Sequence, residues 1–218
     1  WRAVFVRTGN LDGDGHVDLA TGGWWYRNPA SAGGTWTRQT IGEPLRNVAV
    51  LHDFDGDGDL DVLGTRGGRT LSNSRLAWAD NDGAGAFTVR TNVQAAGGDF
   101  LQGAAVLDGG GGRPTRVALS WHDASGGLET ITVPAAPAAK RWSWSKLSAV
   151  ASGEDLTAAD LDDDGDRDLV LGRRWLRNDG DSWSDQTLAP DFPTPDRHEL
   201  VDLDGDGRLD VVLGEESV

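Results

Sequence analysis

The chain has 218 residues, with 20 basic and 35 acidic residues and a formal net charge of −15. Its length suits one domain with an apolar core, and its 38% hydrophobic content argues against wholesale disorder. The absence of cysteine excludes a disulfide framework and thiol catalysis. No apolar run approaches the ~18 residues of a membrane-spanning helix, and the acidic balance argues against a nucleic-acid partner. We therefore expect neither membrane insertion nor nucleic-acid binding.

Most of the negative charge is confined to four windows of nine residues. These windows hold 18 of the 35 acidic residues and only two basic ones, so the rest of the chain is close to neutral. Carboxylates packed this closely repel one another unless a cation lies among them, and the composition therefore predicts bound metal. The windows are NLDGDGHVD at 10–18, DFDGDGDLD at 53–61, DLDDDGDRD at 160–168 and DLDGDGRLD at 202–210.

The windows recur with a regular period. The first two begin 43 residues apart and the last two 42, and the long gap between them holds a degenerate copy, DGGGGRPTR, at 108–116. We call the five segments loops 1 to 5 in chain order. Each is followed by a short apolar run, and the first four are then followed by a tryptophan segment and a further aromatic segment, with period-two alternation and glycine-rich breaks. Each repeat thus reads as four short antiparallel strands, with its loop between the first and the second.

Four-stranded units that repeat every 40–50 residues are typical of a β-propeller. An all-β sandwich is the alternative, but it does not explain why the loop and the tryptophan segment recur in phase. We therefore predict an all-β fold, a β-propeller of four-stranded blades with about four and a half blades present. The open edge of the incomplete fifth blade predicts pairing with another chain or with a missing segment. The expected repeats of this single propeller domain are 1–44, 45–97, 98–150, 151–192 and 193–218.

Loops 1, 2, 4 and 5 share the pattern D-x-D-x-D-G-x-x-D, which suits a hard cation such as Ca²⁺ with six to eight oxygen ligands. Side chains at positions 1, 3, 5 and 9 can point inward, position 7 offers its carbonyl, and the glycine at position 6 permits the turn. The loops lack cysteine and paired histidine, which excludes zinc and copper, and an EF-hand would need helices and a glutamate at position 12. We predict four calcium sites. Their ligands are Asn10, Asp12, Asp14, His16 and Asp18; Asp53, Asp55, Asp57, Asp59 and Asp61; Asp160, Asp162, Asp164, Asp166 and Asp168; and Asp202, Asp204, Asp206, Arg208 and Asp210, with His16, Asp59, Asp166 and Arg208 acting through the backbone carbonyl.

Loop 3 departs from the pattern. Glycine stands at its positions 3 and 5 and Arg116 at position 9, so that Asp108 is its only carboxylate. We expect no ion in this loop, 108–116.

These loops, followed by WWYRN at 24–28 and WLRN at 175–178, resemble the VCBS/FG-GAP repeats, whose calcium loops also occur in integrin α-subunit propellers. The resemblance covers essentially the whole chain except loop 3. It implies a propeller of seven or eight blades, usually extracellular, in which calcium mainly stabilises the blades. Members of the family serve as adhesion or glycan-binding modules, and some of these propellers belong to secreted polysaccharide lyases and sugar dehydratases.

Aromatic and titratable residues outside the loops supply weaker candidates. The tryptophans at one register of the repeats are expected in the blade core, whereas those out of register could stack on sugars. A histidine and a tyrosine at one register, His122 and Tyr26, could act as base and acid in a lyase, although registers of non-adjacent blades need not converge. The core tryptophans are Trp25, Trp78, Trp121 and Trp175, and the stacking candidates are Trp24, Trp142 and Trp144.

We therefore expect a calcium-stabilised, extracellular propeller that binds a glycan or a cell-surface protein, with the glycan favoured. The absence of a complete catalytic constellation favours a binding or adhesion module over an enzyme. The alternative is the propeller domain of a secreted polysaccharide lyase or sugar dehydratase.

Overall fold

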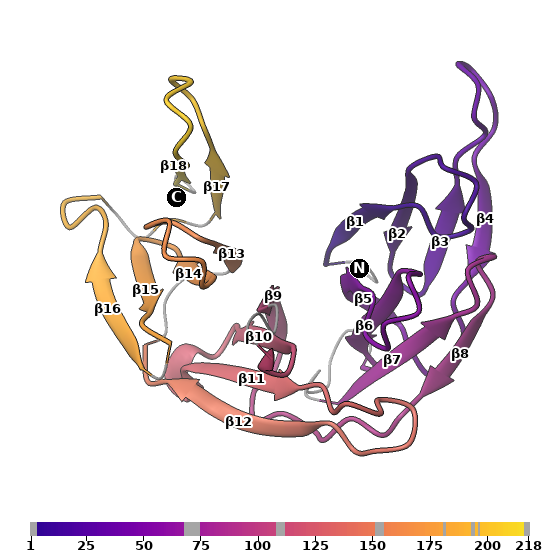
Figure 1. Cartoon of the computed structure of the whole chain (residues 1–218), viewed down its shortest axis with the longest axis horizontal. Coiled ribbons are helices and arrows are strands. Elements are labelled where there is room, and N and C mark those ends of the chain that lie inside the picture. Colours follow the sequence, from indigo (N-terminus) through magenta and orange to yellow (C-terminus); the bar gives the residue numbers. More distant parts are fainter. Residues whose placement is uncertain are drawn as a thin grey trace. The chain divides into compact units, whose positions relative to one another are not determined.

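The computed structural model describes residues 4–67, 75–107, 112–150, 155–180, 182–192, 195 and 197–215. These residues form four antiparallel sheets of four strands and one sheet of two strands (Figure 1). The described part of the chain contains no α-helix, and thus no helix of the length and apolarity that a membrane span requires. The all-β class is confirmed, whereas the total number of blades and the pairing of the open edge stay predictions.

Each sheet is built from strands that are consecutive in the chain and hydrogen-bonded in that order. Sheet 1 contains β1 to β4, sheet 2 contains β5 to β8, sheet 3 contains β9 to β12, sheet 4 contains β13 to β16, and sheet 5 contains β17 and β18. Loops 1, 2, 4 and 5 join the first strand of their own sheet to the second, as the repeats predicted. The strands are β1 Val6–Gly9, β2 Asp18–Thr21, β3 Trp24–Arg27, β4 Thr37–Thr40, β5 Asn47–His52, β6 Asp61–Thr65, β7 Leu76–Asn81, β8 Phe87–Arg90, β9 Leu101–Leu107, β10 Arg116–Trp121, β11 Leu128–Thr132, β12 Ser143–Ser148, β13 Thr157–Ala159, β14 Asp168–Leu171, β15 Arg174–Asn178, β16 Trp183–Thr187, β17 Arg197–Val201 and β18 Asp210–Gly214.

Burial falls from the second strand of a sheet to the fourth. All five residues of β6 and all four of β14 are buried, which fits their short apolar sequences, because a strand covered on both faces needs no polar alternation. All four residues of β4 are exposed, and its sequence TRQT is polar. Loops 2 and 4 therefore lead directly into a fully buried strand, and the last residues of loops 1, 2 and 4, Asp18, Asp61 and Asp168, lie in the core. Loop 5 leads into β18, none of whose residues is buried.

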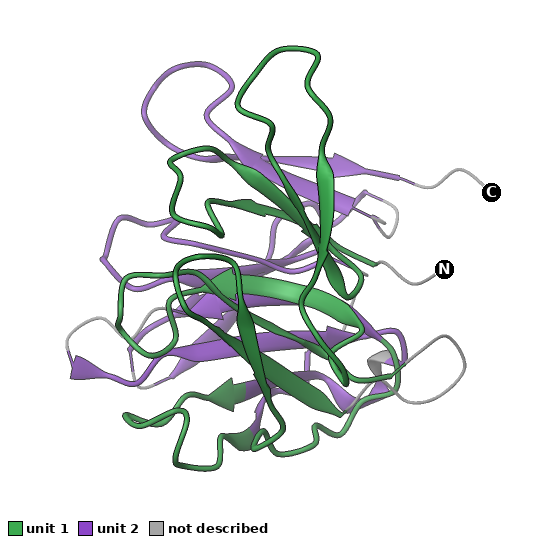
Figure 2. Cartoon of the chain, turned by 90° about the vertical axis from the view of Figure 1, so that its right-hand side faces the viewer, with its two compact units in different colours: residues 1–100, 131–144 green, residues 101–130, 145–218 purple. Residues whose placement is uncertain are grey.

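The chain divides into two compact units (Figure 2). The first comprises residues 1–100 and 131–144, and the second residues 101–130 and 145–218. In the first unit, Leu11 and Trp25 of sheet 1 pack with Val48 and Val62 of sheet 2 in one apolar cluster. In the second unit, a cluster joins residues of sheet 3, such as Leu107, to residues of sheet 4.

The segment 131–144 supplies the first unit with a buried aromatic side chain. Trp142 is fully buried, and its ring lies 5.1 Å from that of Phe54 and 5.2 Å from that of Trp78, centroid to centroid. The side-chain amide of Asn92 ties the segment down by donating to the carbonyl oxygen of Pro137 at 2.7 Å. A fully buried ring cannot stack on a sugar, so the prediction of a sugar-binding role for Trp142 is wrong. Trp142 lies outside the register of the core tryptophans, and it is buried because segment 131–144 returns to the first unit.

Candidate metal centres

The aspartate at position 9 closes each acidic loop on itself. In loop 2, Oδ2 of Asp61 accepts the N–H of Phe54 at 3.0 Å, and Oδ1 accepts the N–H of Asn81 at 2.8 Å. Asp61 is fully buried, and the same pair of bonds forms around Asp18 and Asp168. The equivalent donors are Leu11 and Asn28 in loop 1, and Leu161 and Asn178 in loop 4. One buried carboxylate therefore joins the start of the loop to the third strand of its sheet.

The residue at position 1 organises the turn in three of the loops. Asp53 of loop 2 accepts the backbone N–H groups of Gly56 at 2.7 Å and Gly58 at 3.0 Å. Asp202 of loop 5 repeats this pattern, and Asp160 of loop 4 accepts the N–H at position 6 in the same way. These carboxylates are thus oriented by the backbone before any ligand binds.

Loop 1 has Asn10 at position 1 instead of an aspartate. Its Oδ1 is buried and, within the described part of the chain, has no hydrogen-bond donor. A buried acceptor without a donor is costly, and a cation is a partner that satisfies it. Asn10 therefore fits the predicted role of an oxygen ligand.

In loops 2, 4 and 5 the carboxylates at positions 1, 3 and 5 converge, with one oxygen of each within 4.8 Å of the others. The backbone makes this possible with left-handed residues at positions 4 and 6. Position 6 is Gly58 in loop 2, with φ 97°, and Gly165 in loop 4, with φ 91°. At position 4 of loop 4, Asp163 takes φ 59° where the other loops have glycine. The donor set is oxygen alone, which fits calcium, while the predicted role of the carbonyl at position 7 stays a prediction.

Burial and like charge shift the pKa values of the loop carboxylates. Burial, with a smaller contribution from the nearby carboxylates of Asp55 and Asp80, raises the pKa of Asp61 to about 7 against the opposing effect of two backbone hydrogen bonds. Burial also raises the pKa of Asp168. Burial, and then the charge of Asp57, raises the pKa of Asp55. A bound cation would favour the ionised form of all these groups.

The asparagine three residues after the repeated tryptophan is a site residue that the sequence analysis missed. Besides the N–H bond to position 9, its side-chain amide donates to the carbonyl at position 8, as from Asn28 to Val17 at 2.8 Å and from Asn178 to Arg167 at 3.2 Å. The signal was present in the sequence, because Asn28, Asn81 and Asn178 recur at one register. This asparagine couples each loop to the third strand.

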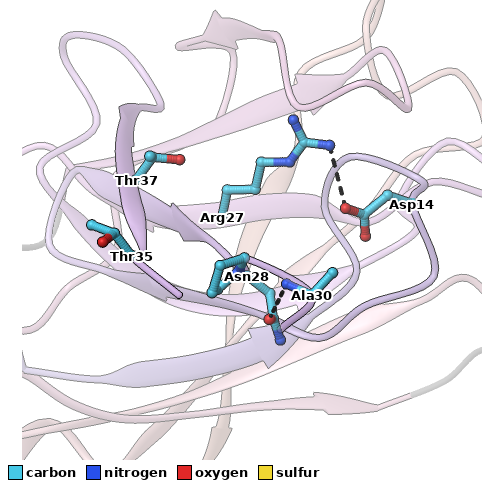
Figure 3. Close-up of a pocket in the computed structure, with 7 residues that line it drawn as sticks. Asp14, Arg27, Asn28, Ala30, Thr35 and Thr37 are labelled. Carbon is cyan, nitrogen blue, oxygen red and sulfur yellow. Dashed lines mark hydrogen bonds and ion pairs between the residues drawn. The ribbon is translucent and has the colours of Figure 1, made fainter. Parts of the chain in front are cut away.

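The residue just before this asparagine also faces its loop. In sheet 1, Arg27 places Nε 2.6 Å from Oδ2 of Asp12 and Nη2 3.3 Å from Oδ2 of Asp14. A pocket of about 290 Å³ opens beside this ion pair, lined also by Asn28 and Thr37 among others (Figure 3). In sheet 4, Arg177 places Nε 3.9 Å from Oδ2 of Asp162. Neither arginine belongs to the loop pattern, so the sequence did not indicate their contacts with the loops.

The aromatic candidates have different surroundings. Trp25, Trp78 and Trp121 are buried, as expected for core positions, whereas Trp175 is half-buried. Trp24 and Trp144 are also half-buried, and the guanidinium of Arg38 lies over the ring of Trp24 at 5.2 Å. Their predicted stacking on sugars stays a prediction.

The titratable candidates lie in different units. Tyr26 is half-buried in β3 of the first unit, and His122 is exposed just after β10 in the second. Their predicted pairing as acid and base stays a prediction. His16 is exposed, as expected of a residue that serves through its backbone.

Part of loop 3, including Asp108, lies outside the described residues. The prediction that this loop holds no ion therefore concerns residues outside the described part of the chain. Two arginines beyond it are described. Arg113 pairs with Asp166 of loop 4, with Nη1 3.2 Å from Oδ2. Arg116 lies over the ring of Trp183, with its guanidinium carbon 6.0 Å from the centroid. Loop 3 thus contributes a positive charge to its neighbour in the same unit.

Comparison with known families assigns one repeat. Residues 160–213 match the model of the FG-GAP-like repeat. The matched range contains loop 4, strands β14 to β16 of sheet 4, and loop 5, so the match confirms the resemblance read from the loops and the tryptophan segments. No curated protein matches the sequence of the chain.

Three solved structures are similar in fold. A rhamnogalacturonan lyase of Bacillus licheniformis has a TM-score of 0.55 at 19% identity, the rhamnogalacturonan lyase YesW 0.53 at 16%, and the exotype rhamnogalacturonan lyase YesX 0.55 at 16%. The matches cover 99% of this chain but only 47%, 47% and 45% of those proteins. The chain therefore spans slightly less than half the length of each. At these identities the likeness concerns the fold, and it supports the reading of FG-GAP-like repeats as propeller blades.

Proposed function

We propose that the chain is a calcium-binding segment of a β-propeller and that loops 1, 2, 4 and 5 each hold one calcium ion. The carrying observation is the convergence of three carboxylates within 4.8 Å in loops 2, 4 and 5, on a backbone that already orients them. The unpartnered Oδ1 of Asn10 supports the same role for loop 1. Four ions add eight positive charges and reduce the formal charge from −15 to −7. Calcium thereby relieves the repulsion inside the loops, so it acts on stability.

The expected energetic effect is moderate for each loop and large in sum. Extracellular calcium modules bind with dissociation constants of ~10⁻⁴–10⁻³ M, so each site adds about 1 kcal/mol of stability in millimolar calcium. Several such sites are comparable with the net stability of a whole domain. We also propose an extracellular location, on the ground of the FG-GAP-like repeat, whose family is usually extracellular.

Direct binding tests the calcium proposal. Equilibrium dialysis should give four calcium ions for each chain, and EDTA should lower the melting temperature sharply. Asp57→Asn in loop 2 should remove one ion, whereas Asp191→Asn, at an exposed acid outside the loops, should remove none. A chain that binds no calcium and melts at the same temperature with and without EDTA would contradict the proposal.

We further propose that these blades belong to a protein that cleaves acidic polysaccharide by elimination. The likeness to three rhamnogalacturonan lyases over 99% of the chain supports this function over the adhesion module. The test incubates this chain, and any longer protein that carries it, with rhamnogalacturonan and follows the ultraviolet absorbance of unsaturated products. Product formation supports a lyase. Retention of the polysaccharide without product favours a glycan-binding module, and neither result in calcium would contradict both readings.

A further inference from the structure

The residue two positions after the repeated tryptophan differs in charge from sheet to sheet. It is Arg27 in sheet 1, Asp80 in sheet 2 and Arg177 in sheet 4. In all three sheets it precedes the asparagine whose N–H closes the loop, so its backbone is held beside that loop. Loops 1, 2 and 4 therefore do not share one electrostatic environment.

Arg27 meets the predicted ligands of loop 1 directly. Its guanidinium contacts Asp12 at position 3 and Asp14 at position 5, at 2.6 and 3.3 Å. The side chain of Asp12 is only 6% exposed, whereas that of Arg27 is 52% exposed, so water screens this ion pair from the arginine side only. A calcium ion that takes oxygens from both carboxylates must break these contacts.

Loop 2 has no such competitor. Its equivalent residue is Asp80, whose Oδ2 holds Arg90 at 2.6 Å from Nη2, while the guanidinium of Arg90 lies over the ring of Trp78 at 5.6 Å. Among the described residues, no arginine or lysine pairs with the carboxylates at positions 1, 3 and 5 of loop 2. The carboxylate of Asp80 also adds a negative charge close enough to raise the pKa of Asp55.

Loop 4 lies between these extremes. Arg177 stands 3.9 Å from Asp162 at position 3 and pairs more closely with Asp179, at 2.5 Å, which lies outside the loop. Arg113 contacts the side chain of Asp166, whose predicted role as a ligand uses the backbone carbonyl instead. Both arginines lower the negative charge around loop 4 without holding two of its ligands.

We infer that Arg27 is a built-in competitor for the cation of loop 1, so that this loop binds calcium more weakly than loop 2 and fills after it. The inference rests on the proposed calcium binding. Calcium entry exchanges one cation for another at Asp12 and Asp14 and releases the guanidinium. Arg27 lines the adjacent pocket of about 290 Å³, which gives the released side chain room (Figure 3).

A site-resolved calcium titration tests the inference. The backbone amide of the position-6 glycine reports on its own loop, because it lies among the ligands at every site. We follow the amides of Gly15 and Gly58 by nuclear magnetic resonance as calcium is added. In the unmodified chain the midpoint for Gly15 should lie at a higher calcium concentration than that for Gly58. Arg27→Gln should lower the Gly15 midpoint about two- to fivefold, the range that an ion pair with one exposed partner supports, and leave Gly58 unchanged.

Arg38→Gln is the matched control. Arg38 lies in the same sheet as Arg27, over the ring of Trp24, and its described contacts do not include loop 1. Its substitution by glutamine therefore removes the same charge without removing a contact to that loop. It should leave both midpoints in place. Because Asn10 also lacks the charge of an aspartate, the shift caused by Arg27→Gln, rather than the order alone, identifies the competitor.

Failure of the inference is distinguishable from failure of the proposed function. If neither glycine responds to calcium, the proposed function fails and the inference with it. If both respond and Arg27→Gln leaves the Gly15 midpoint where it was, the calcium sites stand and the competitor role of Arg27 is overturned. A Gly15 midpoint equal to or below that of Gly58 in the unmodified chain would overturn the order without any variant.

Discussion

The side-chain amide of Asn81 donates a hydrogen bond to the carbonyl oxygen of Leu11, 2.9 Å away and 70 residues earlier in the chain. Leu11 is position 2 of loop 1 and is fully buried, and its own N–H donates to Asp18. Asn81 meanwhile closes loop 2 through Asp61. A single asparagine of sheet 2 thus connects two acidic loops of the first unit, so the stability of one loop depends on the other.

Asn81→Ala should lower the free energy of unfolding by about 1–3 kcal/mol. It leaves the buried carbonyl of Leu11 without its donor, and also that of Leu60, to which the same amide donates at 3.1 Å. Asn28→Ala is the matched control, since the side chain of Asn28 bonds only within its own repeat: it donates to Val17 at 2.8 Å and accepts the N–H of Ala30 at 3.0 Å, both in exposed places. Its cost should stay below about 1 kcal/mol. Urea unfolding in saturating calcium measures both costs, and equal costs would contradict a role for Asn81 between the loops.

The raised pKa of Asp61 predicts an unusual pH dependence in EDTA. The unfolded carboxyl titrates near 3.8 and the folded one near 7, so the folded state binds the extra proton between these values. Its contribution to stability is therefore fully present below pH 3.8 and is lost as the pH rises through 7. Asp61→Asn should flatten this slope, measured by unfolding at several pH values. Calcium should flatten it too, because the cation favours the ionised carboxylate.

A matching proton release should accompany calcium binding. At pH 6, calorimetric titration in buffers of different ionisation enthalpy should detect protons that leave as calcium enters, since the bound ion lowers the pKa of Asp61. At pH 8 the release should vanish, because Asp61 is then already ionised. Calcium binding with no proton release at either pH would show that Asp61 is ionised in the free protein.

Trp142→Ala should lower the free energy of unfolding by about 3–5 kcal/mol, because it removes a fully buried ring that packs on Phe54 and Trp78. Trp36→Ala is the control, since Trp36 is 41% exposed, and its cost should be far smaller. Thermal and urea unfolding measure both variants. A variant at Trp142 that keeps its stability and loses polysaccharide binding would restore the sugar-stacking role that the burial of the ring excludes.

Asp163→Gly should stabilise the chain by about 1 kcal/mol in EDTA. Asp163 adopts φ 59° at position 4, where loops 1, 2 and 5 have glycine, and glycine takes this conformation without the strain of a Cβ. The change also removes a charge from an anionic loop, so Asp163→Asn serves as the control for charge, because asparagine tolerates φ about as well as aspartate. If both variants gain the same stability, charge alone explains the effect.

The sequence by itself determined the acidic loops, their order in the chain and the strands around them. The reason is that a nine-residue turn is built from local bonds: Asp53 binds the N–H groups of its own loop, and glycine at position 6 is required by a backbone angle. The period of the loops and the tryptophans likewise fixed the four-stranded sheets, since each sheet is made of consecutive strands.

Only the tertiary structure decided which charges and side chains meet these loops. Nothing in the nine residues of loop 1 indicates that Arg27 holds Asp12, or that Asn81 of the next sheet holds Leu11. The sequence pattern places Trp142 among the sugar-stacking candidates, because the return of segment 131–144 into the first unit depends on packing with residues far away in the sequence. Such contacts depend on how strands distant in sequence come together, and the repeat pattern is the same whether residue 27 is an arginine or an aspartate. The loops are therefore local in origin, while their strength as cation sites is a property of the fold.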